Sequence, residues 1–342
     1  MNSLTYLRWL LVSALFTACA RSEPRQSVTE TLSASSASPI EATLPIAHPL
    51  ASPIAVDSLA GKIVYSAEGD IYVMNADGSG RTRLTTDPAE DFDPVWSPDS
   101  AQIAFRSHRD GNEEVYLMRA DGSDQSNLSN SSGTDYSPAW SPNGQWIAFN
   151  SDRAGSGSIW LIRPDGTVLR QVTDIPGVSE YPTWSPDSRR IAFHCTFGRI
   201  LPSGTGDFEI CVVNADGTGL RQLTDTPGEN KLPAWSPDGA KLAFQSNRNG
   251  WPTLPDYVPL GYDPAEFGDF EIYLMSIDGS GQINLTNNPR EDDTFPAWSR
   301  DGHLVFSRYG CLMVMNDDGS GLVQVSSCDD GGQFPDWYQP AR

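Results

Sequence analysis

A seven-residue unit of the form Pro-x-Trp-Ser-Pro-Asp-Gly recurs along this chain of 342 residues and constrains its fold more than any other feature. Full copies, most with one substitution, occupy residues 94–100, 138–144, 182–188, 233–239 and 296–302, and a shortened copy is Pro335-Asp336-Trp337. The tryptophans of successive copies are 39 to 63 residues apart. A unit that returns at such intervals is typical of a repeat protein.

Each unit is followed by the same order of turn and strand signals. Ser-Pro-Asp-Gly predicts a type I turn, and an apolar triplet such as Ile103-Ala104-Phe105 predicts the strand after it. A variable loop, a second apolar run such as Val115-Tyr116-Leu117-Met118, an Asp-Gly hairpin and a short Leu-Thr or Val-Thr segment complete the unit. Four short strands joined by such turns are one blade of a β-propeller.

The two ends of the repeat region complete one another. The chain from Gly61 begins with the second strand of a blade, whereas Pro335-Asp336-Trp337 is a first strand with nothing after it. An open array would instead need capping repeats at both ends. We therefore predict an all-β, six-bladed β-propeller over residues 61–342, with the ring closed by N-terminal strands that pair with the C-terminal strand. The six tryptophans are expected to pack between adjacent blades as core.

These units resemble the TolB-like β-propeller family, also described as WD-repeat-like, and the resemblance covers Gly61 to Trp337. It implies the propeller fold. The family includes periplasmic scaffold proteins that bind other envelope proteins and lipoproteins, and propellers fused to serine peptidases of the prolyl-oligopeptidase kind. We expect no hydrolase domain after Trp337.

Residues 1–19 have the pattern of a lipoprotein-type signal peptide. The apolar run Trp9–Ala18 is too short to span a bilayer but suits the core of a signal peptide. The small residues before Cys19 resemble a bacterial lipobox, which implies lipidation of that cysteine; a plain secreted protein or an uncleaved anchor is the alternative. Residues 20–60 are rich in Ser, Thr, Ala and Pro and predict a disordered tether.

The charge of the chain excludes one class of partner. With 44 acidic and 23 basic residues, the net charge is -21, so nucleic acid would be repelled. Dispersed carboxylates are also what keeps an exported protein soluble. We expect a monomer that touches a membrane only through its lipid anchor.

If successive strands alternate in direction, the linkers between blades and the variable loops share one face of the disc, here called the loop face. Binding residues concentrate in such irregular segments. The candidate residues are the acids Asp91, Asp93, Asp135, Glu180, Asp292 and Asp293 and the arginines Arg109, Arg153 and Arg248. One interpretation is a ring of acids that receives a cationic group or a divalent ion. The other is that these arginines tie neighbouring blades together by ordinary ion pairs.

Two insertions interrupt the repeats, at residues 196–208 and 247–270. The second contains Trp251 and Tyr257 among four prolines. Such exposed aromatic residues predict a lid over a partner or ligand, or a small hydrophobic cluster that packs on the disc.

No residue pattern supports catalysis or a metal centre. The chain has no Gly-x-Ser-x-Gly motif, its four histidines are not expected to converge, and no His and Cys residues have zinc-ligand spacing. The Asp-Gly hairpins lack the alternating oxygen ligands of calcium loops. We expect no cofactor and no metal, although paired loop-face acids acting on a polysaccharide remain an alternative.

Four cysteines besides Cys19 form two pairs around turns. Cys195 and Cys211 flank the first insertion, and Cys311 and Cys328 flank the hairpin at residues 317–320. Each pair is expected to face across adjacent strands and to form a disulfide in an oxidising compartment. Two reduced, buried pairs are the alternative.

These observations predict a non-enzymatic, extracytoplasmic binding or scaffolding module. It would be a membrane-anchored lipoprotein in the periplasm or on the cell surface, presenting an acidic loop face to an envelope protein or peptide. The alternatives are a carbohydrate- or peptide-active enzyme that uses loop-face carboxylates, and a ligand-sensing lipoprotein.

Overall fold

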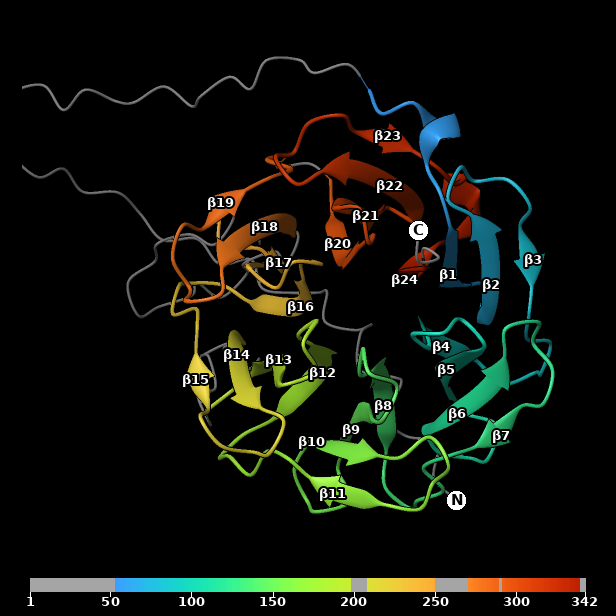
Figure 1. Ribbon diagram of the computed structural model, residues 1–342, viewed down its shortest axis with the longest axis vertical. Helices are drawn as coiled ribbons and strands as arrows, with labels where there is room; N and C mark the ends of the chain where they lie inside the picture. Colours follow the sequence, from blue (N-terminus) through green and yellow to red (C-terminus); the bar gives the residue numbers. More distant parts are fainter. Residues whose placement is uncertain (1–52, 198–207, 250–269, 289–290, 339–342) are drawn as a thin grey trace, which may run out of the picture. The chain divides into compact units, whose positions relative to one another are not determined.

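A computed structural model describes residues 53–197, 208–249, 270–288 and 291–338. Six antiparallel sheets of four strands are arranged around a central axis, as the prediction of a six-bladed propeller requires (Figure 1). The described residues contain no α-helix, and two short 3-10 helices, η1 (Val56–Ser58) and η3 (Cys328–Asp330), lie outside the sheets. No helix among these residues has the length and apolar character needed to cross a bilayer.

Each blade begins with an innermost strand at the channel, and its other three strands follow outward. Blade 1 has β4 (Asp91–Trp96), β5 (Gln102–Ser107), β6 (Glu114–Arg119) and β7 (Ser126–Asn127), and blade 2 has β8 (Asp135–Trp140), β9 (Ile147–Ser151), β10 (Ser158–Ile162) and β11 (Leu169–Gln171). Blade 3 has β12 (Ser179–Trp184), β13 (Arg190–Cys195), β14 (Glu209–Asn214) and β15 (Arg221–Gln222), and blade 4 has β16 (Asn230–Trp235), β17 (Lys241–Ser246), β18 (Glu271–Ser276) and β19 (Ile283–Asn284). Blade 5 has β20 (Asp293–Trp298), β21 (His303–Arg308), β22 (Cys311–Asn316) and β23 (Val323–Gln324), and blade 6 has β24 (Gln333–Tyr338), β1 (Lys62–Ala67), β2 (Asp70–Asn75) and β3 (Thr82–Arg83).

Blade 6 is built from both ends of the repeat region. Its innermost strand, β24, pairs antiparallel with β1, and Trp337 lies opposite Ile63. The prediction that the termini close the ring is therefore confirmed. Because every inner strand is paired with the second strand of its blade, the closed ring leaves no blade incomplete.

The repeated tryptophans fill the interfaces between blades. Trp184 of blade 3 packs with Ile159 and Leu161 of blade 2 as well as with Ile191 of its own blade. Its indole N–H donates to the Ala139 carbonyl, 3.1 Å away. Each of the six interfaces has such a cluster, and five of the six tryptophans are at most 9% exposed. The tryptophans are core, as the sequence predicts.

The Leu-Thr segments hold the outermost strands in place. In blade 3 the Thr224 hydroxyl accepts the backbone N–H of Ile210 at 2.8 Å and donates to the buried Glu209 carboxylate at 2.5 Å. The Asp-Gly hairpins press against the neighbouring blade: Gly78 has a φ of +85°, and a Cβ added there would lie 2.0 Å from the Val325 carbonyl oxygen. The motifs that recur in the sequence thus have a structural role.

The ordered chain begins earlier than the sequence indicates. The predicted tether extends to residue 60, but Ile54, Val56 and Leu59 pack against the core between blades 5 and 6. The Ile54 N–H also donates to the Gly321 carbonyl at 3.0 Å. These apolar residues are isolated among Ala, Ser and Pro, so composition alone does not separate them from the tether. The predicted signal peptide, Cys19 and the rest of the predicted tether up to residue 52 lie outside the described residues.

Candidate functional site

The innermost strand of every blade carries a β-bulge that turns one side chain into the channel. In β4 the register with β5 shifts between Phe92 and Val95, and the same shift occurs in the other blades. The bulged residue has a φ of 49 to 55° and stands directly before the proline of the repeat. These six residues, here called the channel ring, are Asp93, Ser137, Tyr181, Leu232, Phe295 and Phe334.

The left-handed conformation is costly for residues other than glycine, at about 1 to 2 kcal/mol each. It persists only where the surrounding structure enforces it. Here the β-bulge of each inner strand does so, and it directs six side chains into the channel. The structure therefore tolerates backbone strain to present these positions.

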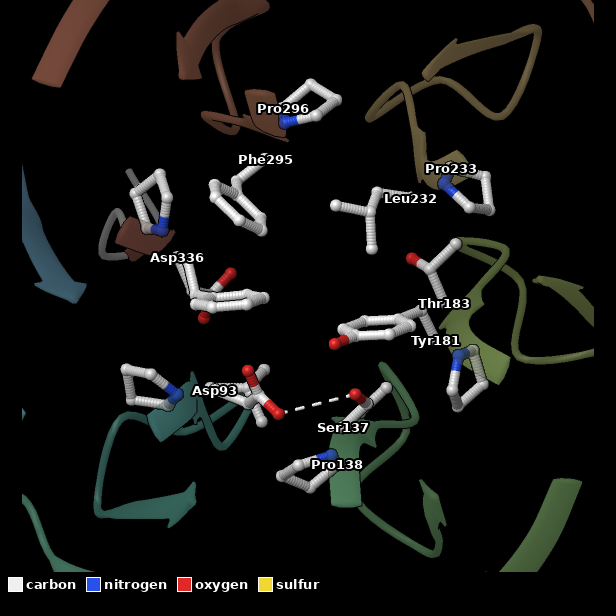
Figure 2. A pocket seen from close by; sticks show the side chains of 16 residues that line it. Asp93, Ser137, Pro138, Tyr181, Thr183, Leu232, Pro233, Phe295, Pro296 and Asp336 are labelled. Atoms are coloured by element: carbon white, nitrogen blue, oxygen red, sulfur yellow. Dashed lines mark hydrogen bonds between the residues drawn. The ribbon is translucent and has the colours of Figure 1, made fainter. Parts of the chain in front are cut away.

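The channel ring lines a cavity of ≈ 160 Å³ (Figure 2). Tyr181 and Phe334 come from blades 3 and 6, on opposite sides of the ring, and their centroids are 6.2 Å apart with planes 5° from parallel. Phe295 lies 4.0 Å from Phe334 between ring centroids. Figure 2 shows Asp93 and Ser137 on one side of this aromatic bridge and Leu232 and Phe295 on the other. The cavity therefore has a polar and an apolar side.

Polar residues of the second strands support the ring from behind. His194 Nδ1 accepts the N–H of Leu232 at 3.4 Å, and the Gln245 amide oxygen accepts the N–H of Phe295 at 3.2 Å. In both cases a side chain of one blade holds the bulge of the next. Burial lowers the pKa of His194, which keeps its ring neutral and Nδ1 free to accept. These contacts fix the channel ring in position.

Asp93 is held by an arginine from the second strand of its own blade. Its Oδ2 lies 3.1 Å from Arg106 Nε and accepts the Ser137 hydroxyl at 3.3 Å. Its Oδ1 has no hydrogen-bond partner among the described residues, and Asp93 is 6% exposed. Burial raises the pKa of Asp93 above its usual range, against the opposing effect of Arg106. One oxygen of this carboxyl is thus left unpaired at the channel.

A second carboxyl, Asp336, lies at the position between Pro and Trp of the repeat. The other five blades have Val95, Ala139, Thr183, Ala234 and Ala297 there. Asp336 lines the channel, and its Oδ2 accepts the backbone N–H of Trp96 from blade 1 at 2.8 Å. Burial raises the pKa of Asp336 to about 6.

The loop-face arginines form ion pairs, but within a blade and not between neighbouring blades. Arg109 Nη2 lies 3.0 Å from Asp91 Oδ2, and Arg153 Nη2 lies 2.5 Å from Asp135 Oδ2. Both acids are fully buried. The reason is the antiparallel register, because the first residue of an inner strand lies opposite the last residue of the second strand, which the arginine follows closely. Asp91 and Asp135 are therefore not part of an open ring of acids.

The other predicted loop-face residues have different environments. Arg248 donates to the Asn230 side chain at 2.6 Å, and Asp293 binds Arg308 through both carboxylate oxygens at 2.6 and 2.8 Å. Glu180 accepts the Tyr136 hydroxyl at 2.8 Å. Asp292 accepts the backbone N–H of Phe270 at 2.9 Å. Trp251 and Tyr257 lie outside the described residues.

Of the predicted candidates within the described residues, only Asp93 lines the channel cavity. Sequence reasoning missed Asp336 and five members of the channel ring, although a signal was present. Those residues flank the recurring proline of the repeat, at positions where the identity changes from blade to blade. Positions that vary inside an otherwise uniform repeat are candidates for function, because the fold does not specify them.

Both cysteine pairs are bonded in the structure, Cys195 to Cys211 and Cys311 to Cys328. The first pair joins adjacent strands, as expected, although diagonally, since Cys211 lies opposite Phe193. The second pair differs from the expectation. It links β22 to the 3-10 helix η3, because Cys328 lies beyond the last strand of blade 5.

Comparison with known proteins agrees with this architecture. Residues 55–155 match the family model of the tricorn protease N-terminal β-propeller domain, and residues 166–258 match that of the TolB β-propeller domain. The chain is 37% identical over 120 residues to the Tol-Pal system protein TolB of Anaeromyxobacter dehalogenans, covering 28% of this chain and 27% of that protein. It is 48% identical over 42 residues to dipeptidyl-peptidase 5 of Porphyromonas gingivalis, covering 12% of this chain and 6% of the peptidase.

The fold is also similar to solved structures. The crystal structure of TolB from Acinetobacter baumannii superimposes with a TM-score of 0.64 at 18% identity, covering 82% of this chain and 67% of that one. At this identity the similarity concerns the fold alone. The match to the curated relatives spans less than a third of the length of each.

Proposed function

Because the chain belongs to the TolB-like β-propeller family, we propose that it is a non-enzymatic binding module that engages an envelope protein at the loop-face mouth of its channel. The observation that carries this proposal is the channel ring. Its six residues share one strained conformation but range from Asp to Phe. Closure of the ring does not require these six positions to differ in an otherwise regular repeat, so their variation is better explained by ligand binding.

The chemistry of the channel fits a protein ligand. A cluster of Phe, Tyr and Leu next to a few polar groups is typical of sites that hold an anchor residue of a partner. In contrast, Asp91, Asp135 and Asp293 are each neutralised by an arginine. The central part of the proposed interface is therefore the channel mouth and not the acids around it.

Photocrosslinking can test this proposal. p-Benzoylphenylalanine in place of Phe334 adds reactive carbonyl chemistry to an aromatic residue of the channel ring, and the same residue in place of Val168 is a control on the exposed turn between β10 and β11. We expect an adduct with an envelope protein from the Phe334 position and none from Val168. Adducts of the same partner from both positions, or from Val168 alone, would contradict the placement of the interface.

We propose further that the protein works outside the cytoplasm, anchored through Cys19. The support is the apolar run before Cys19 and the two disulfides, since disulfides persist in oxidising compartments. A Cys19→Ser variant is expected to lose labelling by radioactive palmitate and to move from the detergent phase to the aqueous phase on Triton X-114 partitioning. Unchanged labelling would contradict the anchor.

The proposal includes the absence of catalysis by the propeller itself. The similarity to dipeptidyl-peptidase 5 covers only 6% of that enzyme, and it falls on a chain built of blade repeats. When the wild-type protein is incubated with cell-wall glycans or with dipeptide substrates, we expect no more turnover than with the double variant Asp336→Asn, Asp93→Asn. Turnover that this double variant abolished would favour an enzyme, with channel carboxylates as its acids in place of the loop-face carboxylates expected from the sequence.

A further inference from the structure

Asp336 is a half-buried acid that the fold does not need at its position. The equivalent residues of the other blades are apolar or Thr, and their blades close in the same way. Within the described residues, backbone N–H groups of Trp96 and Trp337 are its hydrogen-bond donors, and no Lys, Arg or His forms an ion pair with it. Burying a carboxylate without a cation is unfavourable. An acid in a cavity without a cation partner is therefore a candidate functional group.

Asp93 provides a second carboxyl in the same cavity, on the neighbouring inner strand. β24 and β4 are neighbouring inner strands, and the hydrogen bond from Trp96 to Asp336 joins them directly. Figure 2 shows that both Asp93 and Asp336 line the cavity. Asp93 Oδ1 is buried and has no partner among the described residues. The pair therefore offers one uncompensated charge and one free acceptor.

The rest of the cavity is unsuited to a metal ion. Calcium needs six to eight oxygen ligands and magnesium an octahedral shell, and the described residues contain no group of three or more acidic, His or Cys side chains placed to hold a metal. Phe295, Phe334 and Tyr181 instead present aromatic rings, which attract organic cations and bury apolar groups. A volume of ≈ 160 Å³ accommodates roughly ten water-sized groups.

We propose that the channel binds a primary ammonium group that carries an apolar body. The Asp336 carboxylate takes the charge, Asp93 Oδ1 accepts a second N–H, and the apolar body packs on Phe334 and Phe295. The ammonium belongs either to a small amine or to a lysine side chain of the partner proposed above. In the second case this inference rests on the proposed function.

Titration calorimetry with the full-length protein in detergent tests the inference without any partner. The ligands are 2-phenylethylamine and 2-phenylethanol, which have the same apolar body but differ in charge. We expect the amine to bind at least tenfold more tightly than the alcohol at pH 7.5. We also expect its affinity to rise from pH 5 to pH 7, because the carboxylate form of Asp336 is the one that binds. Equal affinities of the amine and the alcohol, or binding of millimolar calcium but not of the amine, would overturn the site.

Two variants separate the charge from the fold. Asp336→Asn keeps an acceptor for the Trp96 N–H and is expected to lose at least tenfold in amine affinity. Asp99→Asn is the control, because Asp99 is an exposed turn acid and blade 2 already has Asn143 at the equivalent position. An unchanged affinity in Asp336→Asn, with its fold verified by circular dichroism, would refute the role of Asp336. The comparison of amine with alcohol decides the question even if that variant does not fold.

A third ligand distinguishes the source of the ammonium. N-acetyl-phenylalanyl-lysine amide carries a lysine side chain but no free N-terminus. Tighter binding of this compound than of 2-phenylethylamine assigns the site to a lysine of a protein partner, and the reverse order assigns it to a free amine. If a partner crosslinks at the channel mouth but neither amine binds, the proposed function stands and the ammonium site is refuted.

Discussion

Replacing Asp336 with Asn is expected to stabilise the protein at neutral pH and to have no effect on stability in acid. Burial raises the pKa of this carboxyl from 3.8 to about 6. Below pH 3.8 the group is protonated in both the folded and the unfolded chain and makes no difference. As the pH rises from about 4 to about 6, the unfolded chain ionises while the folded chain resists ionisation, so the wild-type protein loses stability.

The magnitude follows from the size of the shift. One pKa unit corresponds to about 1.4 kcal/mol, so a rise of about two units corresponds to roughly 3 kcal/mol at pH 7 and above. Asn has no such cost, and its side-chain oxygen can still accept the N–H of Trp96. The free energy of unfolding of Asp336→Asn should therefore exceed that of the wild type by up to roughly 3 kcal/mol at pH 7.5.

Urea unfolding followed by tryptophan fluorescence, repeated at half-unit steps between pH 4 and pH 8, measures this difference. The curve for Asp336→Asn minus wild type should be near zero at pH 4, rise through about pH 5 and level off above pH 6.5. Asp99→Asn, measured in parallel, should show no such rise. A difference that is constant with pH would show that Asp336 is not a buried titrating group, and a destabilised variant at pH 7.5 would show that the carboxylate itself strengthens the hydrogen bond to blade 1.

Three further substitutions test the fold by the same urea measurement. Trp184→Ala should lower the free energy of unfolding by about 3 to 5 kcal/mol, because it empties the interface between blades 2 and 3; a loss below 1 kcal/mol would show that the tryptophan is not a wedge. Thr224→Ala should lower the free energy of unfolding by about 1 to 3 kcal/mol, since it leaves a buried N–H and a buried carboxylate without their shared partner. The control Thr218→Ala, in an exposed turn, should lower it by less than half as much. Equal losses in the two variants would contradict the structural role of Thr224. Gly78→Ala should lower the free energy of unfolding by about 1 to 3 kcal/mol more than Gly111→Ala does. Both glycines have a positive φ, but of the two only Gly78 is in contact with the next blade. Similar losses in the two variants would show that the contact can relax.

Much of the architecture is encoded locally. The Pro-x-Trp unit fixes where each inner strand lies, and the Leu-Thr segment fixes where each blade ends, because the Thr224 hydroxyl bonds within its own blade. The incomplete copy at Pro335 and the missing first strand before Ile63 were enough to predict how the ring closes. Each of these features depends on contacts inside one repeat or on counting repeats, and both are visible in a sequence.

The candidate site was less accessible. From the sequence, Asp91, Asp93 and Asp135 are equivalent acids near one face of the disc. The structure separates them, because Asp91 and Asp135 meet arginines that lie 18 residues further along the chain, while the β-bulge turns Asp93 into the channel. Asp336 reads as one more residue of a shortened repeat. Its burial and its bond to Trp96, 240 residues away, follow only once six strands converge on one axis.

The number of blades, the way the ring closes and the pairing of the cysteines can be predicted from the repeats alone. The tertiary structure decided which acids are neutralised, which residues form the channel ring and where an unpaired carboxylate remains. The physical reason is that a blade is stabilised by its own turns and by apolar periodicity, which repeat along the chain. The channel has no such periodicity, because its residues acquire their surroundings from other blades.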